Sequence, residues 1–230
     1  MTDITAEKLA SYIDHTLLKP TAVRSEIELL CKQAIEYGFC SVCINPRWIP
    51  LAAELLKGSK VKVCSVIGFP FGAELTKIKA VQTKVAIFAG ADEIDMVADL
   101  AAVIDGDSDY LFDDLRAVVK VCHSMRPPVA LKVIIEAAAL TVPQKEFVCK
   151  IANRAGADFV KTSTGLHQAG GATVEDVALM KANAGHCRVK AAGGIRTLEQ
   201  ALAMIEAGAE RIGTSAGVAI IEQLKQEQAK

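Results

Sequence analysis

The stretch VALKVIIEAAALTVPQKEFVCKIANRAGADFVKTSTG (residues 129–165) has the pattern of a strand, a helix and a second strand in succession. Its two ends, VALKVIIE and ADFVKTSTG, are short and almost continuously apolar, which is typical of strands in a parallel sheet covered on both faces. Between them, TVPQKEFVCKIANRAG has apolar residues three and four apart and ends at Gly156, as an amphipathic helix does. The stretch therefore predicts two parallel strands joined by a helix.

The same unit recurs along the whole chain. Eight apolar runs are separated by helical patterns, most of which end at glycine, and the runs are SYIDHTLL, FCSVCINP, VKVCSVIGFP, ADEIDMVAD, VALKVIIE, ADFVKTSTG, CRVKAAGG and ERIGTSAG. Eight units favour an α/β fold, a single-domain (β/α)8 TIM barrel spanning residues 1–230, with an extra N-terminal helix at residues 6–12 that would cap its bottom. An open doubly wound sheet is the alternative, which the absence of a glycine-rich fingerprint after the first strand disfavours.

Composition limits the partners of the protein. The chain has 26 basic and 27 acidic side chains and no basic run, so nothing indicates binding to nucleic acid or to an anionic membrane surface. The first residues, which include Asp3 and Glu7, do not resemble a signal peptide, and no apolar run is long enough to span a bilayer. We therefore expect a cytoplasmic protein that binds small molecules.

The seven cysteines are predicted to be reduced and mostly buried, because their number is odd and they lie in apolar segments. Cys40 and Cys43 form a C-x-x-C pair, which can indicate a thioredoxin-like redox motif or half of a zinc site. Both are disfavoured, because the pair lies inside the strand-like FCSVCIN and no second pair follows. The four histidines show no metal-ligand spacing either. We predict no metal and no cofactor.

Three lysines interrupt apolar strands at equal intervals of 29 residues: Lys132, Lys161 and Lys190. The spacing places them on the consecutive strands 5, 6 and 7 of the barrel, facing the same interior. Polar or glycine-containing segments follow Lys161 and Lys190 almost at once, so these two lie near the open mouth, whereas Lys132 lies one layer deeper. Asp95, in the preceding strand, can supply the counter-charge.

Amines this close together predict nucleophilic chemistry. Each disfavours protonation of the other, so at least one should be substantially neutral near pH 7 and able to form a Schiff base with a carbonyl. The alternative is that all three lysines are structural. Lys132 in particular is expected to act as a positive charge paired with Asp95 or Glu136.

The last two strands end in segments suited to a phosphate. Gly193 and Gly194 lead into a helix near Thr197, and the segment Gly213-Thr214-Ser215 leads into another near Val218. Exposed backbone N–H groups at helix starts bind phosphate, and barrels of this kind commonly do so here. Glycines used only for tight turns are the alternative. Residues 167–171 (HQAGG) are expected to close the same site.

Several of these segments together resemble the 2-deoxyribose-5-phosphate aldolase family of class I lyases. The matching motifs cover essentially the whole chain and are YIDHTLL (12–18), ADEIDMV (91–97), LKVIIE (131–136), FVKTSTG (159–165) and VKAAGGIRT (189–197). The resemblance implies reversible cleavage of 2-deoxy-D-ribose 5-phosphate to acetaldehyde and D-glyceraldehyde 3-phosphate in the cytoplasm. Alternatives are another class I aldolase or a transaldolase of phosphorylated sugars, and a non-catalytic phosphosugar-binding barrel.

The resemblance also implies roles for individual residues. Lys161 would form the Schiff base, Lys190 would lower the pKa of Lys161 and assist proton transfer, and Asp95 would exchange protons through a water. The substrate would contact Asp14, Thr16, Cys43, Lys132 and Thr164. Its phosphate would bind Gly193, Gly194, Gly213, Thr214 and Ser215.

Two departures from the family pattern affect these expectations. Some relatives have a phosphate-binding lysine directly after the TSTG segment, where this chain has Leu166, so the preference for the phosphorylated sugar is left open. The last residues, EQLKQEQAK (222–230), lack a tyrosine that some relatives bring to the site. A symmetric homodimer is the expected alternative to a monomer.

Overall fold

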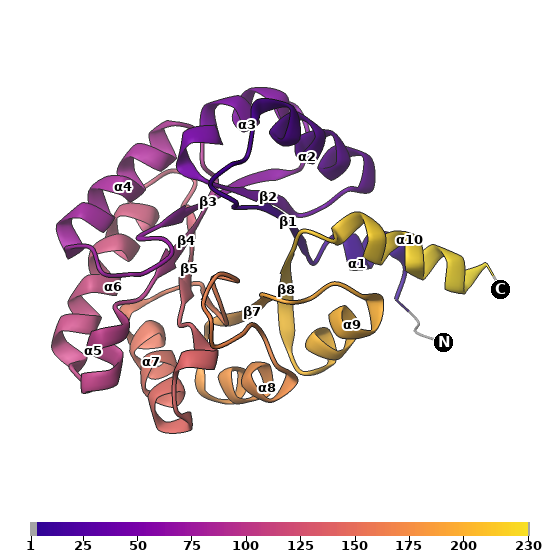
Figure 1. Cartoon of the computed structure of the whole chain (residues 1–230). Helices are drawn as coiled ribbons and strands as arrows, with labels where there is room; N and C mark the ends of the chain where they lie inside the picture. Colours follow the sequence, from indigo (N-terminus) through magenta and orange to yellow (C-terminus); the bar gives the residue numbers. More distant parts are fainter. Residues whose placement is uncertain (1–3, 230) are drawn as a thin grey trace.

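Eight parallel strands close into a barrel in chain order in the computed structural model, which describes residues 4–229 (Figure 1). Residues 1–3 and 230, which the predicted domain 1–230 also includes, lie outside the described part. The strands are β1 (Ile13–Leu17), β2 (Ser41–Ile44), β3 (Lys62–Ile67), β4 (Glu93–Val97), β5 (Ala130–Ile134), β6 (Phe159–Lys161), β7 (Arg188–Ala192) and β8 (Ala209–Thr214). β8 pairs with β1, so the predicted (β/α)8 barrel is confirmed and the open sheet is wrong.

Helices form an outer ring around this barrel (Figure 1). They are α1 (Ala6–Ala10), α2 (Arg24–Tyr37), α3 (Ile49–Leu55), α4 (Thr76–Phe88), α5 (Leu100–Asp105), α6 (Ser108–His123), α7 (Val142–Ala155), α8 (Val174–Asn183), α9 (Leu198–Glu206) and α10 (Gly217–Gln228), with short 3-10 turns η1 (Pro46–Trp48) and η2 (Ala137–Ala139). None of the helices within residues 4–229 is long and apolar enough to cross a membrane.

Local sequence signals explain where the helices begin and end. α7 starts after Thr141, whose backbone N–H donates to the Gln144 side chain at 2.9 Å, so one amide of the first turn is satisfied. It ends at Gly156, whose φ of 88° is left-handed and therefore favours glycine. The chain can then turn directly into β6, as the sequence of this unit predicts.

The N-terminal helix α1 is two residues shorter than the predicted range of 6–12, because Ser11 caps its C-terminal end and Tyr12 leads into β1. It packs against α10, and the Gln228 side chain donates to the Ile4 carbonyl at 3.0 Å. Helices α1 and α10 accordingly lie side by side at one side of the barrel (Figure 1). The segment 222–229 is thus held in and just after α10, beside α1.

Strand register decides which side chains share a layer of the barrel interior. Lys161 pairs with Ile134 of β5 and with Lys190 of β7, whereas Lys132 pairs with Asp95 of β4. Lys161 and Lys190 therefore lie at the same height. Lys132 lies two residues deeper, as predicted from its position within the strand.

Candidate active site

A cavity of about 450 Å³ opens at the carboxyl ends of strands β1, β6, β7 and β8. Lys161 is the one lysine of the three that lines it, and the predicted substrate residues Thr16 and Thr164 line it as well. All the predicted phosphate residues are also in its wall, namely Gly193, Gly194, Gly213, Thr214 and Ser215. The amine and the glycine loops thus face one shared space.

Beneath this cavity the three lysines converge on one carboxylate. Asp95 Oδ2 accepts from Lys161 Nζ at 2.8 Å and from Lys190 Nζ at 2.7 Å, and Asp95 Oδ1 accepts from Lys132 Nζ at 2.8 Å. The convergence follows from the barrel, because β4, β5, β6 and β7 are consecutive neighbours and their inward side chains meet at the axis. Asp95 supplies the counter-charge that the sequence predicts.

The surroundings fix the charge of most of these groups. Burial alone would lower the pKa of Lys132, but the carboxylates of Asp95 and Glu93 outweigh it and raise that pKa well above its ordinary value. Burial is likewise outweighed at Lys190, whose pKa is raised by Asp14 and Asp95. The lysine ammoniums hold the pKa of Asp95 well below its ordinary value despite its burial. Mutual repulsion between amines is therefore not the dominant effect at Lys132 and Lys190, which remain cations.

Asp14, one of the expected substrate contacts, does not line the cavity. Its side chain is fully buried and contacts Lys190 at 2.5 Å, Ser41 Oγ at 2.7 Å and Arg211 Nε at 2.8 Å. These three donors turn the carboxylate inward and across the barrel. Asp14 is therefore part of the charged interior and not of the cavity wall.

Lys132 pairs with Asp95, one of its two expected partners. Lys132 contacts Glu93 at 2.6 Å in addition to Asp95, and it lies too deep to line the cavity. Glu136, the other expected partner, instead accepts from the backbone N–H of Thr164 at 3.1 Å. Its φ of 52° is unusual for a non-glycine residue, so this contact holds a strained turn against the loop after β6.

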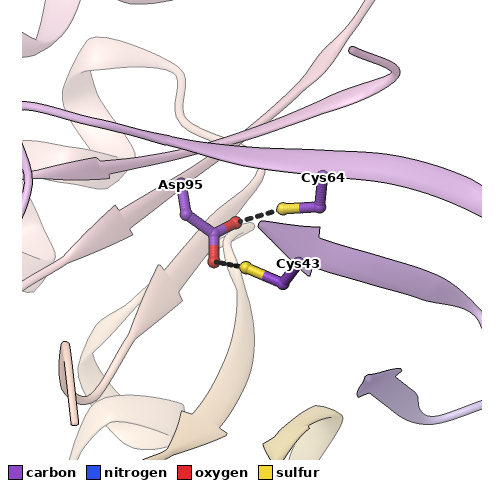
Figure 2. Close-up of side chains that lie close together, drawn as sticks. All are labelled: Cys43, Cys64 and Asp95. Carbon is purple, nitrogen blue, oxygen red and sulfur yellow. Dashed lines mark hydrogen bonds between the residues drawn. The ribbon is translucent and has the colours of Figure 1, made fainter. Parts of the chain in front are cut away.

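Cys43, one of the expected substrate contacts, is fully buried and does not line the cavity. Figure 2 shows its thiol and that of Cys64 pointing at the same carboxylate, with sulfur to oxygen distances to Asp95 of 4.0 and 3.1 Å. Contact with Cys64 lowers the pKa of Cys43, whereas burial raises the pKa of Cys64 well above its ordinary value. The neighbouring thiol of Cys43 is therefore Cys64, from β3, and not Cys40 of the C-x-x-C pair.

Two thiols and a carboxylate within 4.8 Å of one another form a donor set that a thiophilic cation could use. Both oxygens of Asp95, however, already accept from ammonium groups. A divalent cation here would lie within a few ångströms of three positive charges. The surrounding charge therefore disfavours a metal at this position.

The other end of the cavity is built from closely packed glycine loops. Gly193 has a left-handed φ of 92°, and its carbonyl accepts from Ala172 N at 3.0 Å, so the loop after β6 is tied to the loop after β7. A Cβ added to Gly171 would lie 2.5 Å from the Gly193 carbonyl carbon, which leaves no room for a side chain. The segment 167–171 thus packs, through its last glycine, against the loop after β7, one of the two loops predicted to bind a phosphate.

Two cations of the cavity wall were missed by sequence reasoning, namely Lys19 and Arg196. Arg196 is part of the quoted VKAAGGIRT segment, and its position directly after the two glycines was the available signal. Leu166, which stands where some relatives have a lysine, also lines the cavity and is about half exposed (54%). The cavity therefore has positive charge near the glycines although position 166 is apolar.

Comparison with known proteins now adds to this geometry. Residues 8–223 match the model of the DeoC/LacD family aldolases. The chain belongs to this family. It is 54% identical over 187 residues to the deoxyribose-phosphate aldolase of Streptococcus gordonii, covering 81% of this chain and 83% of that protein. It is 52% identical over 188 residues to the deoxyribose-phosphate aldolase of Clostridium perfringens, covering 81% and 82% of the two chains.

Solved structures agree with the assignment to this aldolase family. The deoxyribose-phosphate aldolase of Aeropyrum pernix superposes with a TM-score of 0.90 at 34% identity, over 97% of this chain and 93% of that one. An aldolase called QR15 superposes with a TM-score of 0.89 at 40% identity, over 96% and 97%. The protein is accordingly an aldolase, a lyase that makes and breaks carbon–carbon bonds in small molecules.

Proposed function

We propose that this aldolase reversibly cleaves 2-deoxy-D-ribose 5-phosphate to acetaldehyde and D-glyceraldehyde 3-phosphate through a Schiff base on Lys161. The observation that carries the proposal is the position of the Lys161 amine. It lies in the cavity wall at the layer of Lys190, opposite glycine loops suited to a phosphate. Relatives more than 50% identical to this chain share the corresponding name.

The first half of the reaction joins the substrate to Lys161. The neutral amine adds to the aldehyde carbon C1 of the open-chain sugar to give a carbinolamine. The carbinolamine hydroxyl then leaves as water, with a proton donated by the Lys190 ammonium, and a protonated imine remains. Lys190 suits this role because Asp14 and Asp95 keep it charged within reach of Lys161.

The second half breaks the bond between C2 and C3. Removal of the proton from the C3 hydroxyl lets the C2–C3 electron pair move into the protonated imine, and glyceraldehyde 3-phosphate leaves. Asp95, held ionised by the lysines, is the proton acceptor, through a water. The enamine then takes up a proton at C2, and hydrolysis of the imine releases acetaldehyde and restores Lys161.

The phosphate is proposed to bind the loops after β7 and β8. Gly193, Gly194 and Ser215 offer backbone groups at the cavity wall, and Arg196 adds a guanidinium that forms no ion pair with the residues described here. Thr214 shapes the second loop, since its hydroxyl donates to the Ile195 carbonyl at 2.6 Å and accepts from Ala216 N at 2.9 Å. Arg196 is proposed to supply the charge that some relatives have at position 166, whereas Lys19, the other cation of the wall, is paired with Glu26 at 2.5 Å.

Trapping the intermediate tests the proposal. Borohydride added with acetaldehyde should fix a reduced two-carbon adduct on Lys161, detected by mass spectrometry of the digested protein, and Lys161→Met should abolish both adduct and turnover. Lys181→Met is the matched control, because Lys181 is an exposed lysine paired with Glu210 outside the cavity. A folded wild-type enzyme that releases acetaldehyde from deoxyribose 5-phosphate without an adduct on Lys161 would refute the Schiff-base assignment.

Oligomeric state and location are proposals of the same kind. We propose a homodimer formed through α4. An exposed apolar stripe at helical spacing runs along this helix and the residue before it, namely Leu75, Ile78, Val81, Val85 and Phe88. A stripe on one helix can pair with its copy about a two-fold axis, and Val85→Asp should convert the dimer to a monomer in analytical ultracentrifugation. A single monomeric species in the wild type would refute the dimer.

The seven free cysteines support a reducing, cytoplasmic location.

A further inference from the structure

A second charged layer lies directly beneath the three lysines. Arg211, on β8, bridges two carboxylates, donating to Asp14 through Nε at 2.8 Å and to Glu93 through Nη2 at 2.9 Å. Glu93 also contacts Lys132 at 2.6 Å, and Asp14 also contacts Lys190 at 2.5 Å. Neither Arg211 nor Glu93 lines the cavity. The two residues therefore reach the reaction centre only through other side chains.

Buried charges in this interior do not balance when every group is ionised. The carboxylates are Asp14, Glu93 and Asp95, and the cations are Lys132, Lys161, Lys190 and Arg211, all with side chains at most 8% exposed. With the thiols neutral, the set carries one positive charge in excess. Loss of one proton from one amine makes the numbers of buried positive and negative charges equal.

The contacts single out the amine that gives up this proton. Lys132 and Lys190 each touch two carboxylates, whereas Lys161 touches Asp95 alone, at an oxygen that it shares with Lys190. Lys161 is also the lysine of the three that reaches the cavity. The amine that restores charge balance by losing its proton is thus the proposed nucleophile.

We propose that Glu93 and Arg211 are positioning residues that set the charge balance of the lysine cluster, and with it the pH at which Lys161 presents a neutral amine. The inference rests on the proposed Schiff-base role of Lys161 and goes further, because it assigns a function to two residues that touch neither substrate nor cavity. Removing Glu93 leaves two excess positive charges, which favours proton loss. Removing the positive charge of Arg211 leaves no excess positive charge, which disfavours proton loss.

Every strand contributes an ionisable group to this interior, and each has to be considered in a pH experiment. The groups are Asp14 on β1, Cys43 on β2 with Cys40 just before it, Lys62 and Cys64 on β3, Glu93 and Asp95 on β4, Lys132 on β5, Lys161 on β6, Lys190 on β7 and Arg211 on β8. Lys62 contacts Glu93 at 3.0 Å, but its side chain is half exposed (51%), so solvent screens it.

Borohydride trapping of acetaldehyde as a function of pH measures the effect. Compared with wild type, Glu93→Gln should move the midpoint of adduct formation to lower pH and Arg211→Met should move it to higher pH. We expect about one pH unit in each direction, the size that a unit charge has at about 10 Å in an effective dielectric of about 20. Glu93→Gln/Arg211→Met, which removes one charge of each sign, should return the midpoint to within about 0.3 units of wild type.

Two controls separate this role from a merely structural one. Arg211→Lys keeps the charge and should keep the midpoint, even where it weakens the fold. Asp114→Asn removes an equally buried carboxylate, one that pairs with Lys79 between α4 and α6 at 2.7 Å outside the barrel, and should destabilise the protein without moving the midpoint. Shifts of the same sign in both single variants, or no shift in folded variants, would overturn the proposal.

If the single variants do not fold, the protonation states of the lysines can be measured directly in the wild-type enzyme. ¹⁵N NMR of the lysine side chains should show Lys132 and Lys190 protonated from pH 6 to pH 9, and titration of either lysine in that range would contradict the charge balance. Failure of the proposed function is distinguishable, because it would appear as a wild-type enzyme without any adduct on Lys161.

Discussion

Gly171→Ala should damage recognition of the phosphate while leaving the Schiff base intact. A Cβ at position 171 would lie 2.5 Å from the carbonyl carbon and 3.0 Å from the Cα of Gly193. Carbon atoms pack at about 3.5 to 4.0 Å, so one of the two loops has to move by about 1 Å. Displacement of a binding group by about 1 Å can cost about 100-fold in rate.

We therefore expect kcat/KM for deoxyribose 5-phosphate to fall by about 10- to 100-fold, with activity on unphosphorylated deoxyribose changed by less than about two-fold. Steady-state kinetics with both sugars measures the ratio. Gly185→Ala is the control, because its Cβ would lie 2.5 Å from Asn153 Cγ, away from the cavity, and should lower stability without changing the ratio. An unchanged ratio in folded Gly171→Ala would refute the placement of the phosphate beside Gly193.

Three further outcomes are expected. Arg196→Met should lower kcat/KM for the phosphorylated sugar by about ten-fold or more, because a charge-assisted hydrogen bond contributes about 1.5–3 kcal/mol, and unaltered kinetics would exclude Arg196 from the phosphate site. Asp114→Ala should reduce the free energy of unfolding by about 3–5 kcal/mol in urea denaturation, since it leaves Lys79 buried without its carboxylate, and a loss below about 1 kcal/mol would contradict this. The pKa of Glu93 is lowered from 4.5 to about 2 because Lys132 and Arg211 outweigh its burial, so its ionised form stabilises the fold above pH 4.5 and that contribution is lost as pH falls towards 2. The urea midpoint should therefore fall less between pH 6 and pH 3 in Glu93→Gln than in wild type, and an equal fall in both would contradict this.

Periodicity was enough to predict the barrel. Each strand shows itself as a short apolar run and each helix as a repeat of three and four, and glycines at helix ends separate them. Depth within the barrel also followed from the sequence, because Val133 and Ile134 after Lys132 place that lysine below Lys161 and Lys190. The end of α1 was misplaced by two residues, since Ser11 and Tyr12 carry no strong stop signal.

Contacts across the barrel could not be predicted in the same way. Arg211 and Asp14 are 197 residues apart, and ERIGT gives no sign that its arginine points inward. Glu93 stands two residues before Asp95 in the same strand, so the alternation of side chains puts both on the inner face, but only the counter-charge nearer the lysines was recognised. The substrate contact of Asp14 was expected from the family motif alone, and the motif does not reveal its partners in the structure, which come from β2, β7 and β8.

The charged interior also explains why single substitutions there are hard to interpret. Seven ionisable side chains are buried together, and each charged one is stable only because the others offset the cost of removing it from water. Removing one of these side chains leaves its partner unpaired, so a single substitution lowers both stability and activity. The effects of several substitutions within such a network are not additive. A pair of substitutions that removes one charge of each sign keeps the balance and separates the two effects. The sign of a pH shift is therefore more informative about these residues than the size of any decrease in rate.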